Sequence, residues 1–526
     1  MSQEKVMLKA TAWSTFADII SRLLGAIYII PWFIFMGRFG TQANALFNMG
    51  YNIYAYFLLV STAGINVAIA KQISKYSSQN DETTLIPLIQ NILRFMIFVG
   101  IIFSVIMYLF SPFLSYISGG NKNLIPIMRS LSLSVLVFPT MSVLRGIFQG
   151  FSNLKPTAIS QIIEQLVRIV WMLLSTYLIM QFGSKNYIDA VTQSTFAAFI
   201  GMIFSCLILF YYLWKSNLFY KIFGTLFFLK EIYSSKDSIK HILETLRESI
   251  PFVITGSAIQ LFQLIDQWTF ISLMHYFFRI NKDELLVQFG YLSANPMKIM
   301  MIIISIASSI GGIGIALITQ NFVKNDKIAN SKLIINNLEL MFLIVLPSLL
   351  GSIVLADSIY QLFYGITAQN AIKIFIFVIF ETFPICLYVV LAPILQSLYE
   401  NKKTIFYFFI GLLTKILLQV PLIYLFKENG PIITSILALT ISCYFMFRRI
   451  LIITELDIKS LKKRLFYVLF YSIIITLILY LIDSYLKIYL PLDNRLNSIL
   501  HIFICGIMAF LLYLKPYKNI VLSKIK

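Results

Sequence analysis

The chain has 526 residues, of which 59% are hydrophobic and 12% are charged, and its mean hydropathy is +0.84. A soluble domain has too little interior to bury that much apolar side chain, so the composition excludes a soluble protein and predicts a polytopic helical membrane protein. The net charge of +19 does not indicate nucleic acid as a partner, because most Lys and Arg residues lie between apolar segments, as orientation against anionic lipid requires.

Fourteen apolar segments are each long enough to cross a bilayer as a helix. They cover approximately residues 12–36, 45–69, 86–110, 124–149, 157–181, 189–214, 249–275, 286–318, 333–355, 371–399, 404–426, 431–449, 465–486 and 497–514. The first is too long for the core of a signal peptide, so we expect a retained helix. Basic residues concentrate in the connections on the side of the N-terminus, which predicts that both termini lie in the cytoplasm.

Two longer basic connections, 215–248 and 448–464, divide this series of helices. The first mixes aromatic and basic residues, as in an amphipathic helix on the inner membrane surface. The predicted organisation is an N-terminal lobe of six helices at 1–214, a cytoplasmic linker at 215–248, a C-terminal lobe of six helices at 249–449, and a final helix pair with its tail at 450–526.

Arg22 lies near the middle of the first predicted span. About ten residues precede it in that span, which places it roughly 15 Å deep. A lone cation there costs at least ~2.5–3.5 kcal/mol, so we expect Arg22 to face an aqueous cavity or a partner. Asp18 lies four residues earlier, on the same helix face. Two interpretations remain: a cavity-lining pair in which Arg22 meets an anionic substrate, or an ion pair that neutralises itself for insertion.

Polar residues continue at helical spacing in the second, fourth and fifth spans. The second span has three asparagines four residues apart, the last of them Asn52, which suits a cavity wall or interhelical hydrogen bonds equally. In the fifth span, Glu164 and Arg168 repeat the carboxylate–guanidinium spacing of four. Arg145, near the inner end of the fourth span, is expected either to reach lipid headgroups or to act as a gate residue at the cytoplasmic mouth.

The second set of spans carries further charges inside apolar segments. Asp266 shares a face of the seventh span with several glutamines and is a candidate either for binding a coupling cation or for acting as a counter-charge. Lys298 lies near the middle of the eighth span and Lys415 within the eleventh. With Arg22 and Arg168, these lysines favour an anionic substrate, provided that the four cations share a cavity.

Two segments match each other without a gap. The segment QGFSNLKPTAISQIIEQLVRI begins at Gln149, and QSLYENKKTIFYFFIGLLTKI begins at Gln396. Their overlay pairs Arg168 with Lys415. The match predicts that the two lobes are parallel repeats, an arrangement typical of transporters that hold their substrate between the lobes.

Enzyme chemistry has little support in this sequence. The four cysteines lie within apolar spans at spacings that suit neither a metal site nor a disulfide framework. The three histidines share no motif, and the outer connections are too short for a catalytic domain. We therefore expect no enzyme activity and no cofactor other than a coupling cation, Na⁺ or H⁺, or the membrane potential.

The segments MLKATAWSTFADIISRLLGAIYIIPWFIFMGRFG, AGINVAIAK, IIEQLVRI and QLFQLIDQWTF resemble the polysaccharide-transport branch of the MOP superfamily. Within it they resemble the MurJ-type lipid II flippases of Gram-positive bacteria and the related stage V sporulation protein B. The resemblance implies an all-α, MATE-like fold of about fourteen transmembrane helices in the plasma membrane of a bacterium. It also implies two six-helix lobes, a terminal pair that holds a lipid tail, and an inward-opening cationic cavity.

The resemblance also implies an activity and a set of site residues. The implied activity is alternating-access transport of undecaprenyl-pyrophosphate-linked peptidoglycan precursor, lipid II, to the outer leaflet. The alternatives are another lipid-linked oligosaccharide, such as a capsule or teichoic precursor, or cation-coupled drug export, which the cationic residues disfavour. Expected partners are the lipid-linked sugar, the bilayer and other cell-wall synthesis proteins, with the protein a monomer. Arg22 is implied as the main headgroup contact, and the full predicted binding set is Arg22, Asp18, Arg145, Glu164, Arg168, Lys298, Asn52 and Lys415, with Asp266 as the ion-coupling candidate.

Overall fold

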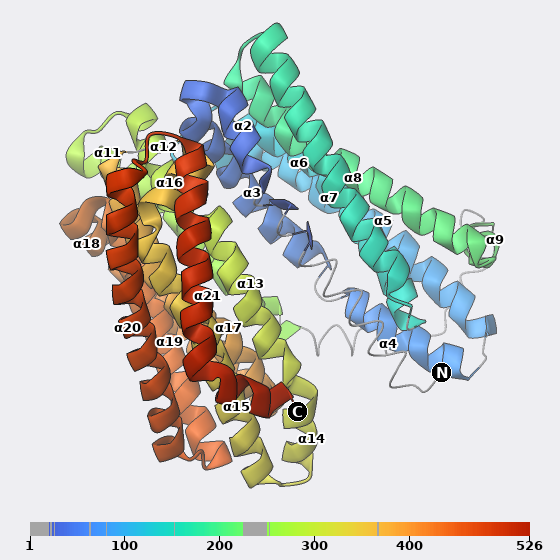
Figure 1. The fold of residues 1–526 in the computed structure, drawn as a ribbon. Coiled ribbons are helices and arrows are strands. Elements are labelled where there is room, and N and C mark those ends of the chain that lie inside the picture. Colours follow the sequence, from blue (N-terminus) through green and yellow to red (C-terminus); the bar gives the residue numbers. More distant parts are fainter. Residues whose placement is uncertain are drawn as a thin grey trace. The chain divides into compact units, whose positions relative to one another are not determined.

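The computed structural model describes residues 20–21, 24–25, 27–62, 65–79, 82–151, 153–224, 250–251, 253–365 and 368–525. These residues form helices joined by short connections and contain no β-strand, which confirms the predicted all-α architecture (Figure 1). The chain divides into two compact units, residues 1–268 and 269–526. Asp18, Arg22 and most of the predicted linker lie outside the described residues.

The first unit is organised around one central helix, α6. It packs against α3, α4, α5 and α8, while α7 lies along α8. The helices of this unit are α2 (Ile29–Met36), α3 (Gly40–Thr62), α4 (Ile65–Ser78), α5 (Glu82–Ile117), α6 (Leu124–Gly150), α7 (Lys155–Tyr177), α8 (Tyr187–Lys215) and α9 (Leu218–Phe223), followed by α11 (Ala258–Phe278), which extends into the second unit.

The second unit repeats this plan around α17. This helix packs against α13, α15 and α19, while α18 lies along α19. The helices are α12 (Lys282–Phe289), α13 (Asn295–Ile313), α14 (Ile315–Val323), α15 (Lys327–Val354), α16 (Ala356–Tyr364), α17 (Gln369–Ser397), α18 (Asn401–Phe426), α19 (Gly430–Thr454), α20 (Ile458–Tyr489) and α21 (Arg495–Ile525). The matching segments at Gln149 and Gln396 span equivalent turns, α6–α7 and α17–α18, so the predicted repeat is present in the packing.

Ten stretches of the described residues are long and apolar enough to cross a membrane, and one of them, Asn401–Thr454, contains both α18 and α19. Helices α3 and α11 are not among the ten, because asparagines in α3 and glutamines in α11 lower their hydropathy. These two helices and the first predicted span, of which residues 20–21, 24–25 and 27–36 are described, account for the predicted spans that are not among these stretches.

The terminal helices α20 and α21 pack on the second unit. Helix α20 contacts α15 and α21, and α21 contacts α16. The Arg464 guanidinium of α20 donates to Glu339 Oε2 of α15 at 2.9 Å. The prediction that residues 448–464 form a long connection is wrong. Helix α19 continues to Thr454 and α20 begins at Ile458, so most of this segment is helical. Basic residues here extend the helices beyond their apolar spans, where the charged heads can reach lipid headgroups.

Candidate functional site

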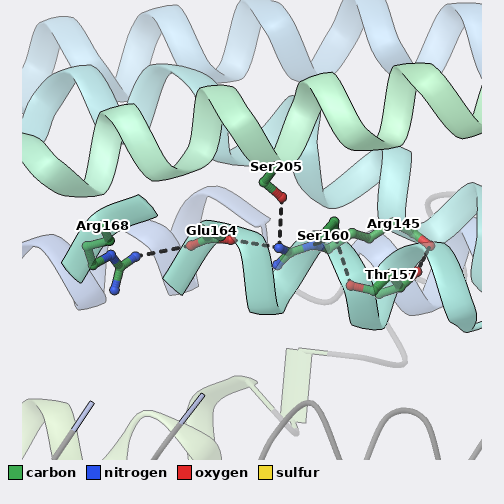
Figure 2. Close-up of polar contacts among 6 residues, drawn as sticks. All are labelled: Arg145, Thr157, Ser160, Glu164, Arg168 and Ser205. Atoms are coloured by element: carbon green, nitrogen blue, oxygen red, sulfur yellow. Dashed lines mark hydrogen bonds and ion pairs between the residues drawn. The ribbon is translucent and has the colours of Figure 1, made fainter. Parts of the chain in front are cut away.

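Three helices of the first unit bring predicted site residues together. Arg145 lies near the end of α6, and Glu164 and Arg168 lie one turn apart on α7. Helix α8 covers them and adds Ser205 (Figure 2). The helices containing these residues are all candidate membrane spans. The structure thus brings together Arg145, Glu164 and Arg168, three residues of the predicted binding set, of which only Glu164 and Arg168 were expected to be neighbours.

Glu164 is the centre of this group. Its Oε2 accepts a hydrogen bond from Arg145 Nη2 at 2.6 Å, and its Oε1 accepts one from Arg168 Nη2 at 3.1 Å. The three side chains are 13–20% exposed. Each carboxylate oxygen thus has its own charged donor, a strong arrangement in a region with little water.

Arg145 is held by neutral partners as well. Its Nε donates to Ser160 Oγ at 3.3 Å, and its Nη2 donates to Ser205 Oγ at 3.0 Å (Figure 2). Thr157 Oγ1 donates to the Arg145 carbonyl at 3.5 Å. Contacts from α7 and α8 therefore fix the direction of the guanidinium, so Arg145 faces this group instead of extending freely to lipid headgroups.

Arg168 has a hydrogen-bond donor that its contact with Glu164 does not use. Its Nε is buried and has no hydrogen-bond partner among the described residues, and the same holds for the hydroxyl of Tyr51 on α3. Arg168 interacts electrostatically with Tyr51 and Tyr54, so α3 lies close to this side of α7. Two guanidinium groups share one carboxylate, which leaves one excess positive charge and unused donors: a group able to bind an anion.

Gly201 of α8 allows α7 to approach this closely. A Cβ atom at this position would lie 2.6 Å from the Glu164 carbonyl oxygen and 3.4 Å from Arg168 Cβ. Such a contact is too short for any larger residue, so the missing side chain sets the α7–α8 distance at the level of the ion pairs.

Asn52 belongs to a different set of contacts. It is buried, and its Nδ2 donates to Oε1 of Gln267 on α11 at 3.1 Å. Gln267 in turn donates to the Met49 carbonyl and to Ser118 Oγ. This pattern matches the interhelical hydrogen bonds that were one of the two expectations for the asparagines. Asp266, the neighbour of Gln267, is half-buried.

The two predicted lysines of the second unit differ from each other. Lys415 is fully buried, and its ammonium donates to the Pro431 carbonyl at 2.9 Å and to Ser435 Oγ at 2.7 Å on α19. Its repeat partner Arg168 joins an ion-pair network instead. Lys298 is half-buried on α13, one turn after Asn295.

Sequence reasoning missed the polar residues that complete the group. Ser160 lies four residues before Glu164, and Ser205 lies four residues after Gly201. Those spacings put each serine on the same helix face as its neighbour. Serines at such spacings are common in membrane helices, so only the packing of α6, α7 and α8 identifies these two.

Comparison with known proteins identifies the family. A family model described as polysaccharide biosynthesis protein matches residues 7–311. The lipid II flippase MurJ of Bacillus subtilis (strain 168) is 32% identical over 460 residues, which cover 84% of this chain and 82% of the relative. The chain belongs to the polysaccharide biosynthesis protein family.

Solved structures agree with this family assignment at the level of the fold. A structure of the lipid II flippase MurJ in an inward closed conformation has a TM-score of 0.61 at 15% identity and covers 96% of this chain and 99% of that one. An inward-facing MATE multidrug transporter of the MOP superfamily has a TM-score of 0.62 at 16% identity, covering 85% and 99%. This member of the family is thus a multi-pass membrane protein with a MurJ- and MATE-like fold.

Proposed function

We propose that this protein is a flippase that moves the undecaprenyl-pyrophosphate-linked peptidoglycan precursor, lipid II, from the inner to the outer leaflet by alternating access. The observation that supports it is the group formed by Arg145, Glu164 and Arg168. This group has one excess positive charge, and the Nε–H donor of Arg168 has no partner among the described residues. A relative that is 32% identical to this chain is a lipid II flippase.

The chemistry of a pyrophosphate diester suits this group. Its oxygens accept paired hydrogen bonds from guanidinium groups, which present donors in a planar fork. Arg168 has one such donor, Nε–H, without a partner among the described residues. In the proposed binding step the pyrophosphate takes this donor and replaces one carboxylate oxygen of Glu164 as the partner of Arg168. Glu164 thus limits the cost of two buried cations until the substrate arrives.

The membrane potential supplies a driving force of the correct sign. A potential of 100 mV, negative inside, favours export of each negative charge by ~2.3 kcal/mol. Two charges on the pyrophosphate would gain ~4–5 kcal/mol if they crossed the whole field. In the proposal, Asp266 binds the Na⁺ or H⁺ that resets the protein, and Arg22 with Asp18, Lys298 and Lys415 provides further headgroup contacts.

Depletion in the native host tests this proposal. Cells that lose the protein should accumulate undecaprenyl-linked lipid II facing the cytoplasm and then lyse, and mass spectrometry of lipid extracts measures the stalled intermediate. The parent should rescue growth, whereas Arg168→Ala should not, and Arg168→Lys, which keeps the charge but not the fork, should rescue poorly.

Matched variants separate loss of function from loss of folding. Arg464→Ala removes an arginine of the second unit whose ion pair joins α20 to α15, and this variant should rescue growth. Membrane abundance of each variant is measured by immunoblot. Normal lipid II with a different stalled oligosaccharide would move the assignment to a capsule or teichoic precursor. No stalled lipid at all would reject flippase activity.

A further inference from the structure

A second buried group of ionisable side chains lies where α16, α20 and α21 meet. It contains His501 of α21, Asp483 and Lys487 of α20, and Asp357 of α16. His501 and Asp483 are buried, at 0% and 2% side-chain exposure, while Lys487 and Asp357 are 34% and 44% exposed. The chain of contacts thus leads from a half-exposed carboxylate to a fully enclosed imidazole.

Both ring nitrogens of His501 face oxygen atoms that can accept hydrogen bonds. Nδ1 lies 2.9 Å from Asp483 Oδ1, and Nε2 lies 2.9 Å from the carbonyl oxygen of Leu490. A neutral imidazole has a single N–H, so one of its nitrogens would direct a lone pair at an oxygen. A neutral ring beside a carboxylate has one proton for these two contacts. Both contacts are hydrogen bonds only if the His501–Asp483 pair holds a second proton.

The position of Lys487 indicates whether His501 or Asp483 holds the second proton. Its ammonium donates to Asp483 Oδ2 at 2.9 Å and to Asp357 Oδ2 at 2.7 Å. A cation beside Asp483 stabilises the carboxylate, so the proton belongs on the imidazole. The four groups then alternate in sign along the chain and sum to zero, which is the arrangement that a buried ionic cluster needs.

The surroundings of the pair contain few other ionisable groups. Cys505, one turn further along α21, is buried and interacts with Asp483 and Lys487. The Arg495 guanidinium, at the start of α21, lies against Gly365 at the end of α16. Beneath the group, Leu355, Ile475 and Leu479 form an apolar cluster with Cys505. Apolar side chains therefore border the ion pairs where Cys505 contacts this cluster.

The group connects the terminal helices to the rest of the second unit through α16. Lys487 joins α20 to Asp357 at the start of α16. Further along α16, Tyr360 Oη accepts a hydrogen bond from Asn295 Nδ2 at 2.8 Å, and Tyr364 Oη donates to the Asn295 carbonyl. Asn295 begins α13, which carries Lys298 one turn later.

We infer that His501 is a buried proton-binding site and that its proton stabilises the packing of the C-terminal helix pair, α20 and α21, against α16. We call this proton-dependent attachment the clasp. While the pair holds its proton, both acceptors of His501 are satisfied and the cluster is neutral. As the pH rises and the proton leaves, Asp483 or the Leu490 carbonyl loses its donor and the cluster gains a negative charge. The attachment of α20 and α21 to α16 then weakens. This inference does not rest on the proposed transport activity.

Nitrogen NMR of the ring tests the protonation state directly. The full-length protein, labelled with ¹⁵N-histidine and placed in lipid nanodiscs, contains three histidines, and His241→Gln and His275→Gln variants assign the His501 signals. We expect two ring nitrogens with nearly equal shifts at about pH 6 and a change to the widely separated shifts of a neutral ring as the pH is raised. A neutral ring at all pH values would overturn the assignment.

Hydrogen exchange of α16 and α21 tests the clasp. Exchange in residues 356–364 and 495–505 is expressed relative to α17, because intrinsic exchange rates also depend on pH. In the parent, raising the pH should speed the relative exchange about tenfold, and His501→Gln should exchange fast at every pH.

His275→Gln is the matched control. His275 is a helix-end histidine whose Nδ1 contacts the Ile280 carbonyl, and this variant should behave as the parent. An identical pH response in the parent and in His501→Gln would overturn the clasp, even if the ring proved to be charged.

Discussion

At the scale of residues, the balance of charge around Glu164 is the central feature. One carboxylate compensates two guanidinium groups, and each oxygen accepts from a different arginine. A bare pair of arginines would repel each other in a region of low dielectric, and two carboxylates would leave no attraction for an anion. The group therefore has an excess of only one positive charge, and this excess is the feature on which the proposed anion binding rests.

Replacement of Glu164 tests how much its negative charge stabilises the protein. Glu164→Gln keeps the shape of the side chain but leaves two partly buried cations without a counter-charge, so the free energy of unfolding should fall by roughly 2–3 kcal/mol. Steric trapping in bicelles measures this change.

Glu400→Gln provides a matched comparison. Glu400 also contacts two cations, Lys403 and Arg449, but at the α17–α18 turn and with greater exposure. Its replacement should therefore cost less than 1 kcal/mol or so. Equal losses for the two variants would show that the Glu164 network has no special role in stability.

At the scale of elements, small residues set how closely helices approach. Gly201 lets α8 lie against the backbone of α7, and Gly311 plays the same part between α13 and α17, where a Cβ would lie 3.0 Å from the Val389 carbonyl oxygen. Gly311 thus allows α13 and α17 to pack closely. Polar contacts then form at a separation that the glycines determine.

Gly201→Ala should separate α7 from α8. The added methyl group would overlap the Glu164 carbonyl oxygen, so we expect a loss of about 1–3 kcal/mol in the free energy of unfolding. We also expect a weaker contact between Arg145 on α6 and Ser205 on α8, because α8 is displaced. Thermal unfolding of the purified protein gives the first quantity.

Gly351→Ala is the comparison for helix propensity. Gly351 lies within α15, and a Cβ there meets nothing within 4 Å. Alanine favours a helix over glycine by up to ~1 kcal/mol, so this variant should be neutral or slightly more stable. A loss of stability in Gly351→Ala as large as that in Gly201→Ala would contradict the packing explanation.

At the scale of the whole molecule, the two units repeat one helix arrangement but carry different chemistry. Arg168 of the first unit joins an ion-pair network, whereas its repeat partner Lys415 is fully enclosed and donates to α19. The difference follows from the neighbouring turn: the position of Glu164 is occupied in the repeat by Gly411, which packs against Ala438 and Ser442. The repeat of the helix arrangement therefore does not extend to the polar contacts of the equivalent residues.

Membrane orientation is testable with single cysteines, since the four native cysteines are buried. The basic connections predict both termini inside, which places exposed Lys122 outside and exposed Lys324 inside. An impermeant maleimide added to intact cells should label Lys122→Cys at once and Lys324→Cys only after permeabilisation. The reverse pattern would show that the charge bias does not set the orientation.

Much of this architecture follows from local sequence patterns. Predicted spans such as 124–149 and 371–399 coincide closely with helices, whereas 45–69 runs from α3 into α4 and 286–318 covers parts of α12, α13 and α14. Helices form there because twenty or so apolar residues in a bilayer must satisfy their backbone hydrogen bonds within a helix. Spacings of four placed Glu164 beside Arg168 for the same local reason. The aligned turns at Gln149 and Gln396 indicated the two repeats.

Partners on separate helices depended on the tertiary structure. Nothing in the spacing of Arg145 showed that it would share Glu164 with Arg168, nor that Lys415 would face α19 and Asn52 would meet Gln267. The buried pair of His501 and Asp483 was equally hidden, since eighteen residues and a turn separate its members. Apolar content and periodicity determine that a helix forms and which face is polar, but the direction of a polar side chain is decided by which neighbour packs against it.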